Sequence, residues 1–498
     1  MSYVIGIDLG TSAVKALLVN KSGQVVAEAA SNYPLYHDHS GWSEQDPEDW
    51  VRGTIAAIDE VVTSAKVASN EVAGISFSGQ MHGLVLLDKE GVPLRRAILW
   101  NDTRTTAQCR YIEQVLGEKL IQIARNQALE GFTLPKILWV REHEPDVFAQ
   151  ANVFLLPKDY VRYRLTGQLH MDYSDAAGTL LLDVADKRWS ETLLQSFQLP
   201  LSLCPPLVES HDHVGELLPA IAEQVQLDPT TNVFAGGADN ACGAIGAGIL
   251  HEGLTLSSIG TSGVILAYEA DKTSDFAGKV HFFNHGMQDA YYAMGVTLAA
   301  GYSLSWFKEV FAPHETFDQL LGGIDTISPG SNGLLFTPYL VGERTPYADA
   351  NIRASFIGMD GSHRRSHFVR AVMEGITYSL HESIDLLRNA GKQIDKVVSI
   401  GGGGQNKIWL QMQADIFNTP VVALENEQGP GLGAAMLAAV GAGWFSTLQD
   451  CAQQFVKYGA TYAPEEQATQ TYAELFAIYQ QVYTQTKQIN EQLVPFRA

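Results

Sequence analysis

Near its start the sequence reads Asp8-Leu9-Gly10-Thr11-Ser12-Ala13-Val14, and in its second half it reads Ser258-Ile259-Gly260-Thr261-Ser262-Gly263-Val264. Each copy lies between two short apolar runs that are typical of strands. A tight Gly-Thr-Ser turn between strands directs several backbone N–H groups and hydroxyls to one side, which suits a polyphosphate. Two such turns that face each other would hold a nucleotide from both sides. The repeat therefore predicts a nucleotide-binding protein with one phosphate turn in each half.

The two copies differ at their first position, where Asp8 stands in one and Ser258 in the other. Carboxylates are preferred ligands of Mg²⁺, so Asp8 is a candidate to hold the metal through water while Thr11 and Ser12 meet phosphate oxygens. An Asp that caps a turn is the common alternative. The second copy of the turn favours the functional interpretation, because a hairpin that binds nucleotide phosphates needs a metal anchor.

The composition is typical of a globular protein, with 46% hydrophobic and 18% charged residues among 498. This length suggests roughly two to four domains. The formal net charge of −22 argues against a nucleic-acid partner and against an anionic membrane surface. An anionic substrate must therefore be received by local N–H groups and a metal ion.

The four cysteines lack metal-ligand spacing and indicate free thiols of a reducing cytoplasm: Cys109, Cys204, Cys242 and Cys451. The chain begins directly with a strand, so we expect no signal peptide. The longest weakly polar run, Gly431–Trp444, is too short and too rich in Gly and Ala to span a bilayer. We expect a soluble cytoplasmic protein that does not enter a membrane.

Strand-like and helix-like patterns alternate in both halves, which indicates α/β sheets covered on both faces. The first half predicts three antiparallel strands, a helix and four more strands, at 4–7, 14–19, 25–30, 46–65, 72–77, 83–87, 153–156 and 233–235. The second half repeats the order with strands at 254–258, 264–268 and 397–400 and a helix at 367–389. We place the domain boundary near 246–253. Apolar residues at helical spacing between Tyr472 and Tyr483 predict a last helix that packs on the second domain.

A second focus is a strand that runs into Gly236-Gly237-Ala238-Asp239 and then into a helix of small residues. The glycines let a ligand approach the backbone, and Asp239 stands at the exposed end of the strand. With the ordinary Asp pKa of about 3.9, Asp239 is expected to be ionised and able to accept a proton from an alcohol. A weak base suffices in phosphoryl transfer, where it orients the hydroxyl and takes the proton late. A helix N-cap is the alternative, and the paired glycines favour the catalytic role.

Two further turns are candidate ligand contacts. The stretch Ser78-Gly79-Gln80-Met81-His82-Gly83 breaks a strand pattern with an amide, an imidazole and a flexible apolar group that could read a polyhydroxylated molecule. A lone His of this kind is more often structural. The run Gly401–Gly404 before Asn406 could admit a flat adenine ring against bare backbone, or it could be a plain strand-to-helix turn. The residues alone leave both alternatives open.

Four motifs together resemble the FGGY family of carbohydrate kinases: Asp8-Leu9-Gly10-Thr11, Gly236-Gly237-Ala238-Asp239-Asn240, Ser258-Ile259-Gly260-Thr261-Ser262 and Gly401-Gly402-Gly403-Gly404. The resemblance covers essentially the whole chain. It implies an α/β fold of two actin/Hsp70/hexokinase-type (ribonuclease H-like) domains around a deep interdomain cleft. The implied domains are 1–248, with the sugar site and the catalytic base, and 249–498, with the ATP site and a C-terminal helical extension from about 465.

Within the family, five further motifs resemble members that act on D-xylulose: Gln80-Met81-His82-Gly83, Ile98-Leu99-Trp100-Asn101-Asp102, Leu156-Pro157-Lys158-Asp159-Tyr160, Ser174-Asp175-Ala176-Ala177-Gly178-Thr179 and Pro338-Tyr339-Leu340-Val341-Gly342-Glu343-Arg344-Thr345-Pro346. They imply phosphorylation of the 5-hydroxyl of D-xylulose by ATP with Mg²⁺, which would feed xylose catabolism into the pentose phosphate pathway. We interpret the motifs around Lys158 and Ser174 as structural cores of the sugar domain, and Glu343–Arg344 as an internal ion pair. The family also implies a homodimer.

The resemblance assigns roles residue by residue. Asp239 matches the catalytic base, Met81 and His82 match the sugar-binding pair that works with it, and Asp8 matches the acid near the metal and phosphates. Asp8 and Asp239 are the implied Mg²⁺ ligands, through water. The implied ATP contacts are Thr11, Ser12, Lys15, Gly260, Thr261, Gly402, Gly403 and Asn406. One small departure is Ala238, where many relatives have a third glycine.

Two alternatives remain at this point. Another family member could act on gluconate, ribulose or glycerol, although Gln80-Met81-His82-Gly83 argues against glycerol, for which a charged pair is expected there. An Hsp70-like ATPase switch or an actin-like filament protein would share the nucleotide site. In that case the segments predicted to bind the sugar would have no role. A shared fold does not fix function, so the choice depends on these sites.

Overall fold

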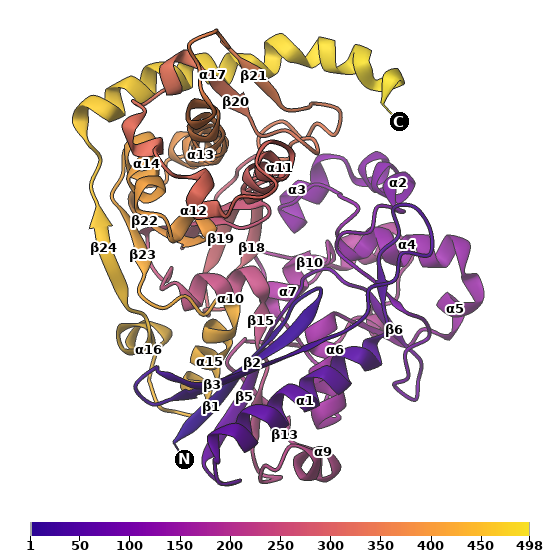
Figure 1. The fold of residues 1–498 in the computed structure, drawn as a ribbon. Helices are drawn as coiled ribbons and strands as arrows, with labels where there is room; N and C mark the ends of the chain where they lie inside the picture. Colours follow the sequence, from indigo (N-terminus) through magenta and orange to yellow (C-terminus); the bar gives the residue numbers. More distant parts are fainter. Residues whose placement is uncertain (1, 498) are drawn as a thin grey trace.

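The computed structural model describes residues 2–497 as two lobes, each built on a seven-stranded mixed sheet (Figure 1). In the first sheet the strand order is β13-β14-β5-β1-β2-β3, with β15 beside β5. The β1-β2-β3 meander is antiparallel and confirms the three expected opening strands, while β5 runs parallel to β1. The strands are β1 (Tyr3–Leu9), β2 (Ala13–Asn20), β3 (Val25–Asn32), β5 (Val72–Gly79), β13 (His213–Glu216), β14 (Asn232–Phe234) and β15 (Gly237–Ala238).

Side chains of β1 alternate between the two faces of the first sheet, as a pleated strand requires. Ile5, Ile7 and Leu9 pack in one core with the buried side of α1 (Pro47–Ala65), whose N-terminus is capped by the Asp46 carboxylate. Val4 faces the other way into a second core. Both faces of this sheet are therefore covered, as expected for an α/β domain.

The rest of the first lobe consists of helices and short strand pairs around the end of this sheet. The expected strands at 83–87 and 153–156 pair with each other outside the main sheet. The helices are α2 (Thr106–Leu116), α3 (Glu118–Ala124), α4 (Thr133–His143), α5 (Pro145–Gln150), α6 (Pro157–Thr166), α7 (Tyr173–Ala177), α8 (Glu191–Ser196), α9 (Pro219–Gln224) and α10 (Asp239–Gly246). The short strands are β4 (Glu44–Gln45), β6 (Val85–Leu87), β7 (Ala97–Ile98), β8 (Val153–Leu155), β9 (Met171–Asp172), β10 (Leu182–Asp183), β11 (Arg188–Trp189) and β12 (Leu207–Val208).

The second sheet has the strand order β18-β19-β17-β16-β22-β23-β24. Its β16-β17 hairpin and the parallel strand β22 repeat the arrangement of β1, β2 and β5. The strands are β16 (Gly253–Ile259), β17 (Gly263–Glu269), β18 (His281–Asn284), β19 (Tyr291–Thr297), β22 (Ile394–Gly401), β23 (Val421–Leu424) and β24 (Tyr458–Tyr462), with β20 (Leu335–Thr337) and β21 (Ser355–Ile357) as a separate pair. The helices are α11 (Gly301–Phe311), α12 (Phe317–Leu320), α13 (Arg365–Asn389), α14 (Lys407–Phe417), α15 (Pro430–Gly441), α16 (Leu448–Phe455) and α17 (Glu466–Leu493).

Helix α15 comes from the second half of the chain and yet packs on the first sheet. It contacts β1, β5 and α10, and Leu432, Ala435 and Met436 share a core with Val4 and Phe234. The approach is so close that a Cβ on Gly433 would lie 1.9 Å from the Cys242 carbonyl oxygen. Figure 1 shows α15 beside β1, below the second sheet, with α16 next to α15. The weakly polar run 431–444 thus lies mostly in a helix that packs on the first sheet.

The last helix, α17, lies along the second lobe (Figure 1). Its buried stripe includes Tyr472, Phe476, Tyr479 and Val482, as the spacing predicted. The three aromatic residues of the stripe pack with Tyr378 of α13. Within residues 2–497, none of the helices is long and apolar enough to cross a membrane.

Candidate active site

The first sheet places Asp239 beside the loop that follows β5. In β15, Gly237 lies opposite Ser78 and Ala238 opposite Gly79, so strands β15 and β5 end side by side. Asp239 is the first residue of α10, and the loop 80–83 is its neighbour. Neighbouring parallel strands end at the same edge, which is why two distant motifs meet.

A cavity of about 250 Å³ lies between the two halves of the chain at this edge. It brings together all three residues predicted for the sugar, Met81, His82 and Asp239. Its other lining residues are Trp100, Leu129, Gly131, Phe132, Asn240, Ser262, Val264, His281, Phe283, Met294, Val296 and Arg344. Aromatic and apolar walls with a few polar groups are typical of a small-molecule site.

The Asp239 carboxyl is not an ordinary one. Burial, and then the nearby Asp8 charge, raise the pKa of Asp239 to about 7, although a hydrogen bond from the Asn240 backbone N–H lowers it. The expectation of an ordinary pKa near 3.9 is therefore wrong, because protein atoms surround much of the carboxyl and the Asp8 charge lies nearby. A pKa of about 7 suits a general base at neutral pH.

His82 is held as a neutral imidazole. Its Nδ1 lies 2.7 Å from the carbonyl oxygen of Gly178, so Nδ1–H donates and Nε2 is left as an acceptor. Burial, and the nearby Lys136 ammonium, lower the pKa of His82 to about 3. A Cβ on Gly178 would lie 2.8 Å from this ring, so the small residue is needed there. His82 can therefore accept a hydrogen bond from a sugar hydroxyl.

Met81 and Asn240 close the cavity beside the base. The Asn240 side-chain N–H₂ group donates to Asp239 Oδ1 at 3.0 Å and lies 3.6 Å from the Met81 sulfur. Met81 is only 4% exposed and also lies near the Tyr292 hydroxyl. These contacts fix the position of both side chains.

Gln80, whose amide could have read a ligand, forms hydrogen bonds within the protein. It is 2% exposed, and its amide N–H₂ donates to Gln45 Oε1 at 3.2 Å and to the Gly10 carbonyl at 3.5 Å. Gln80 therefore supports the first phosphate turn. The sequence alone could not separate this role from ligand binding, because both need a buried amide.

The first phosphate turn lies next to the sugar cavity. Trp100, which lines that cavity, donates from its indole N–H to the Thr11 hydroxyl at 3.0 Å. Burial raises the pKa of Asp8, against the opposing effects of Ser78 and Lys15. The Lys15 ammonium lies 2.8 Å from the Glu28 carboxylate. The roles of Thr11, Ser12 and Lys15 toward phosphates remain predictions.

A second cavity, of about 510 Å³, lies at the corresponding edge of the second sheet. It is lined by five of the predicted ATP residues: Gly260, Thr261, Gly402, Gly403 and Asn406. Asn406 also caps α14, because its Oδ1 accepts from the Ile408 and Trp409 N–H groups at 3.0 Å. Residues 401–404 are thus both a strand-to-helix turn and a cavity wall. Tyr302, Phe317 and Trp409 also line this cavity, and no local pattern had predicted a role for them.

The interpretation of Glu343–Arg344 as an ion pair is wrong. The Glu343 carboxylate accepts hydrogen bonds from the Thr297 and Ser379 hydroxyls and from the Leu298 backbone N–H, and burial raises its pKa to about 7. The Arg344 side chain points elsewhere and lines the sugar cavity. Within residues 2–497 it makes no salt bridge of 4 Å or less. The position of the Arg344 guanidinium in this cavity was not predicted, because the residues next to Arg344 in sequence do not indicate the direction of its side chain.

These features define the class of two-lobed phosphotransferases: a Gly-Thr-Ser turn in each lobe, a cavity at the edge of the second sheet, and a cavity between the halves whose carboxyl has a raised pKa. The profile of the N-terminal domain of the FGGY family of carbohydrate kinases matches residues 3–246, and that of the C-terminal domain matches residues 255–442. The chain belongs to the FGGY family of carbohydrate kinases, which confirms the predicted family and its two-domain α/β fold. The boundary at 248/249 stays a prediction.

The similar proteins are sugar kinases. The xylulose kinase of Bacillus subtilis (strain 168) is 62% identical over 497 residues, 100% of each chain. The ligand-bound xylulose kinase from Lactobacillus acidophilus superimposes with a TM-score of 0.93 at 27% identity, covering 98% of this chain and 99% of that one. A gluconate kinase from the same organism gives 0.92 at 27% identity, with 97% and 98% covered. An ATPase switch or a filament protein is not favoured by these similarities.

Proposed function

We propose that this chain transfers the γ-phosphoryl group of ATP to the 5-hydroxyl of D-xylulose, giving D-xylulose 5-phosphate and ADP. The observation that carries the proposal is Asp239, a carboxyl with a pKa of about 7 in the wall of a cavity shared by both halves. The similarity to xylulose kinases over the full length supports the choice of sugar.

In this proposal Asp239 orients the sugar hydroxyl and accepts its proton. The new bond forms between the hydroxyl oxygen and the γ-phosphorus as the bond from that phosphorus to the departing ADP oxygen breaks. His82 accepts a hydrogen bond from another sugar hydroxyl through Nε2, and Met81 packs against the carbon chain. The loose transition state asks little of the base beyond this positioning.

The nucleotide is held by the second lobe, with the adenine against Gly402, Gly403 and Asn406 and the phosphates on the Gly260–Thr261 turn. Thr11, Ser12 and Lys15 of the first lobe approach the terminal phosphate. Contacts from both lobes exclude water, so that the sugar and not water receives the phosphoryl group.

Asp8 and Asp239 fit a magnesium ion held through water. The charge of Asp8 helps to raise the pKa of Asp239, and burial raises the pKa of Asp8 itself, so a cation would relieve both carboxyls. When bound, Mg²⁺ neutralises phosphate charge. We further propose that the protein is a homodimer. We also propose that it works in the cytoplasm, because its four cysteines are unpaired, as in a reducing compartment.

The test is an ADP-release assay with MgATP on D-xylulose, D-ribulose, L-ribulose, D-gluconate and glycerol, with a blank that contains no sugar. We expect strong turnover on D-xylulose and little on the others. Asp239→Asn should lower kcat by about 10² to 10⁴, the usual contribution of a general base, and leave ATP binding intact. ATP turnover that no sugar changes, or an Asp239→Asn enzyme with near-normal kcat, would contradict the proposal.

A further inference from the structure

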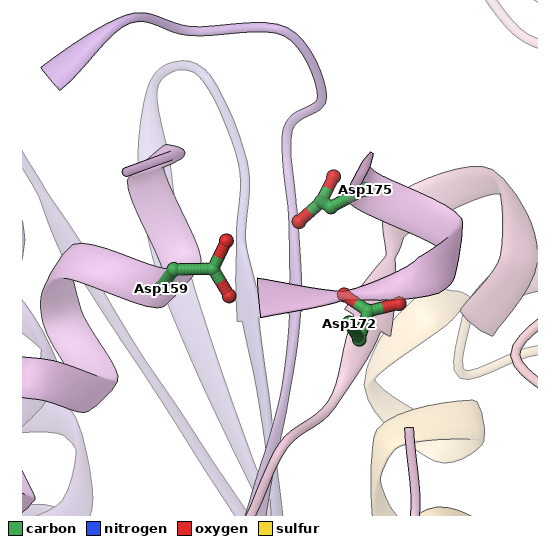
Figure 2. A group of neighbouring side chains, drawn as sticks. All are labelled: Asp159, Asp172 and Asp175. Atoms are coloured by element: carbon green, nitrogen blue, oxygen red, sulfur yellow. The ribbon is translucent and has the colours of Figure 1, made fainter. Parts of the chain in front are cut away.

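Three carboxyls converge beside the end of β5: Asp159 of α6, Asp172 of β9 and Asp175 of α7 (Figure 2). All three side chains are fully buried. The Lys158 ammonium lies 2.6 Å from an oxygen of Asp159, 2.6 Å from one of Asp172 and 2.9 Å from one of Asp175. The chain itself therefore supplies the cation that this group of carboxyls requires.

The buried cluster combines three carboxyls with two cations, Lys158 and Arg162. Burial raises the pKa of Asp175 well above its usual value, against the effect of Lys158. The two cations face the carboxyls of Asp159 and Asp172. Removing one member of a buried ion pair lowers protein stability strongly, so we expect this buried cluster to be rigid.

A short series of hydrogen bonds joins this buried cluster to the turn 237–239, which carries Asp239. The Ser174 backbone N–H donates to Asp172 Oδ2 at 2.8 Å, and the Ser174 hydroxyl donates to the same oxygen. The Ala238 backbone N–H donates to the Ser174 hydroxyl oxygen at 2.9 Å. Ala238 immediately precedes Asp239, whose own carboxylate is bonded only to its neighbour Asn240 among the described residues.

We infer that Ser174 is a positioning residue for the base, because its hydroxyl ties the backbone at Ala238 to the buried Asp172. This inference rests on the proposed function. Ser174 lines neither cavity. It affects the reaction only through the position of the Asp239 side chain. Small displacements of a reacting group can lower the rate of a positioned reaction strongly.

Ser210 offers a matched control. Its hydroxyl donates to the same Asp172 oxygen at 3.2 Å, and its side chain is also buried. The hydroxyl forms no bond to the turn 237–239 within residues 2–497. Ser174→Ala and Ser210→Ala therefore each remove one buried hydrogen bond to Asp172, and only the first also frees Ala238.

The experiment compares kcat, KM for ATP and the melting temperature of the two variants with those of the wild type. We expect Ser174→Ala to lower kcat about tenfold or more with KM for ATP unchanged, because the turn that holds Asp239 loses its hydrogen bond to Ser174. Ser210→Ala should keep kcat within about twofold at a similar loss of melting temperature. Equal losses of kcat in both variants, or no loss in Ser174→Ala, overturn the inference. If Ser174→Ala does not fold, Ser174→Cys keeps the size with a weaker acceptor and should show the same pattern in milder form.

A second readout separates this inference from the proposed function. Melting temperatures at pH 8 are measured for Ser174→Ala, Asp239→Asn and the double variant, without any sugar. If Ser174 positions Asp239, the two substitutions are non-additive, since both act on the same hydrogen-bonded turn. Additive effects overturn the inference even if the enzyme phosphorylates D-xylulose. Non-additive effects with no turnover on any sugar refute only the proposed function.

Discussion

The protonation of the Asp239 carboxyl should control the rate near neutral pH. Its pKa is raised to about 7, and a general base must be deprotonated to act. We therefore expect kcat/KM for the sugar to be constant above about pH 8 and to fall about tenfold per unit well below pH 7. The measurement is a pH–rate profile with the coupling enzymes in excess at every pH. A profile that stays flat down to pH 5 would show that this carboxyl is not the base.

The same carboxyl should cost stability at high pH. Because the folded-state pKa is raised, the folded protein holds the proton more tightly than the unfolded chain, and stability is lost as the pH rises from about 4 to about 7. Asp239→Asn lacks this penalty, so its melting temperature should exceed that of the wild type by about 2 °C or more at pH 8 and match it near pH 4. Melting curves at both pH values check this. An advantage of equal size at both would contradict it.

Arg344 should contribute to sugar binding. Its side chain lines the sugar cavity and has no salt-bridge partner within the described chain, so its donors are available to a ligand. We expect Arg344→Met to raise KM for the sugar about tenfold with KM for ATP unchanged, and Arg344→Lys to give an intermediate value. Arg353→Met, the same change outside the cavity, is the control. If both Met variants behave alike, Arg344 does not read the sugar.

At the scale of residues, the sequence predicted which residues line the site better than it predicted the surroundings of their side chains. Met81, His82 and Asp239 were found through their Gly-bracketed motifs, and the structure brings them together. The raised pKa of Asp239 and the inward turn of Arg344 depend on neighbours that are distant in sequence. No local pattern records such neighbours.

Among the elements, α15 depends on glycines for its close contact with α10. A Cβ on Gly433 would lie 1.9 Å from a backbone oxygen of α10, which cannot move aside alone. Gly433→Ala should therefore lower stability by about 1 to 3 kcal/mol, as overpacking does. A melting curve or a denaturant titration measures this. Gly361→Ala, where a Cβ meets nothing within 4 Å, is the control and should leave stability nearly unchanged.

Most elements could be predicted because their signals are local. The opening meander, α1 with its Asp46 cap, the β16-β17 hairpin, α13 and α17 all lie close to the predicted ranges. Helix α15 was not predicted, because a run of Gly and Ala has no polar side and reads as neither strand nor surface helix. Its small residues fit partners from the other half of the chain.

In the whole molecule, α15 makes the two halves depend on each other. Residues 1–248 alone would expose Val4, Leu17 and Phe234, which α15 and α16 cover in the intact chain. We expect this fragment to aggregate when it is expressed alone and to become soluble, with restored kinase activity, when residues 249–498 are co-expressed. Solubility and ADP release from both expressions check this. A stable, monomeric fragment 1–248 would contradict it.

The crossing of α15 also bears on how such a protein can change over generations. The paired phosphate turns give the two halves the look of a repeated unit, and repeated units are often free to separate, recombine or acquire different partners. Here one half carries part of the other's core, so neither can be exchanged without its complement. An inherited change at the contact between α15 and α10 is then answered most readily by a second change across it, in a stretch of the gene nearly two hundred codons away.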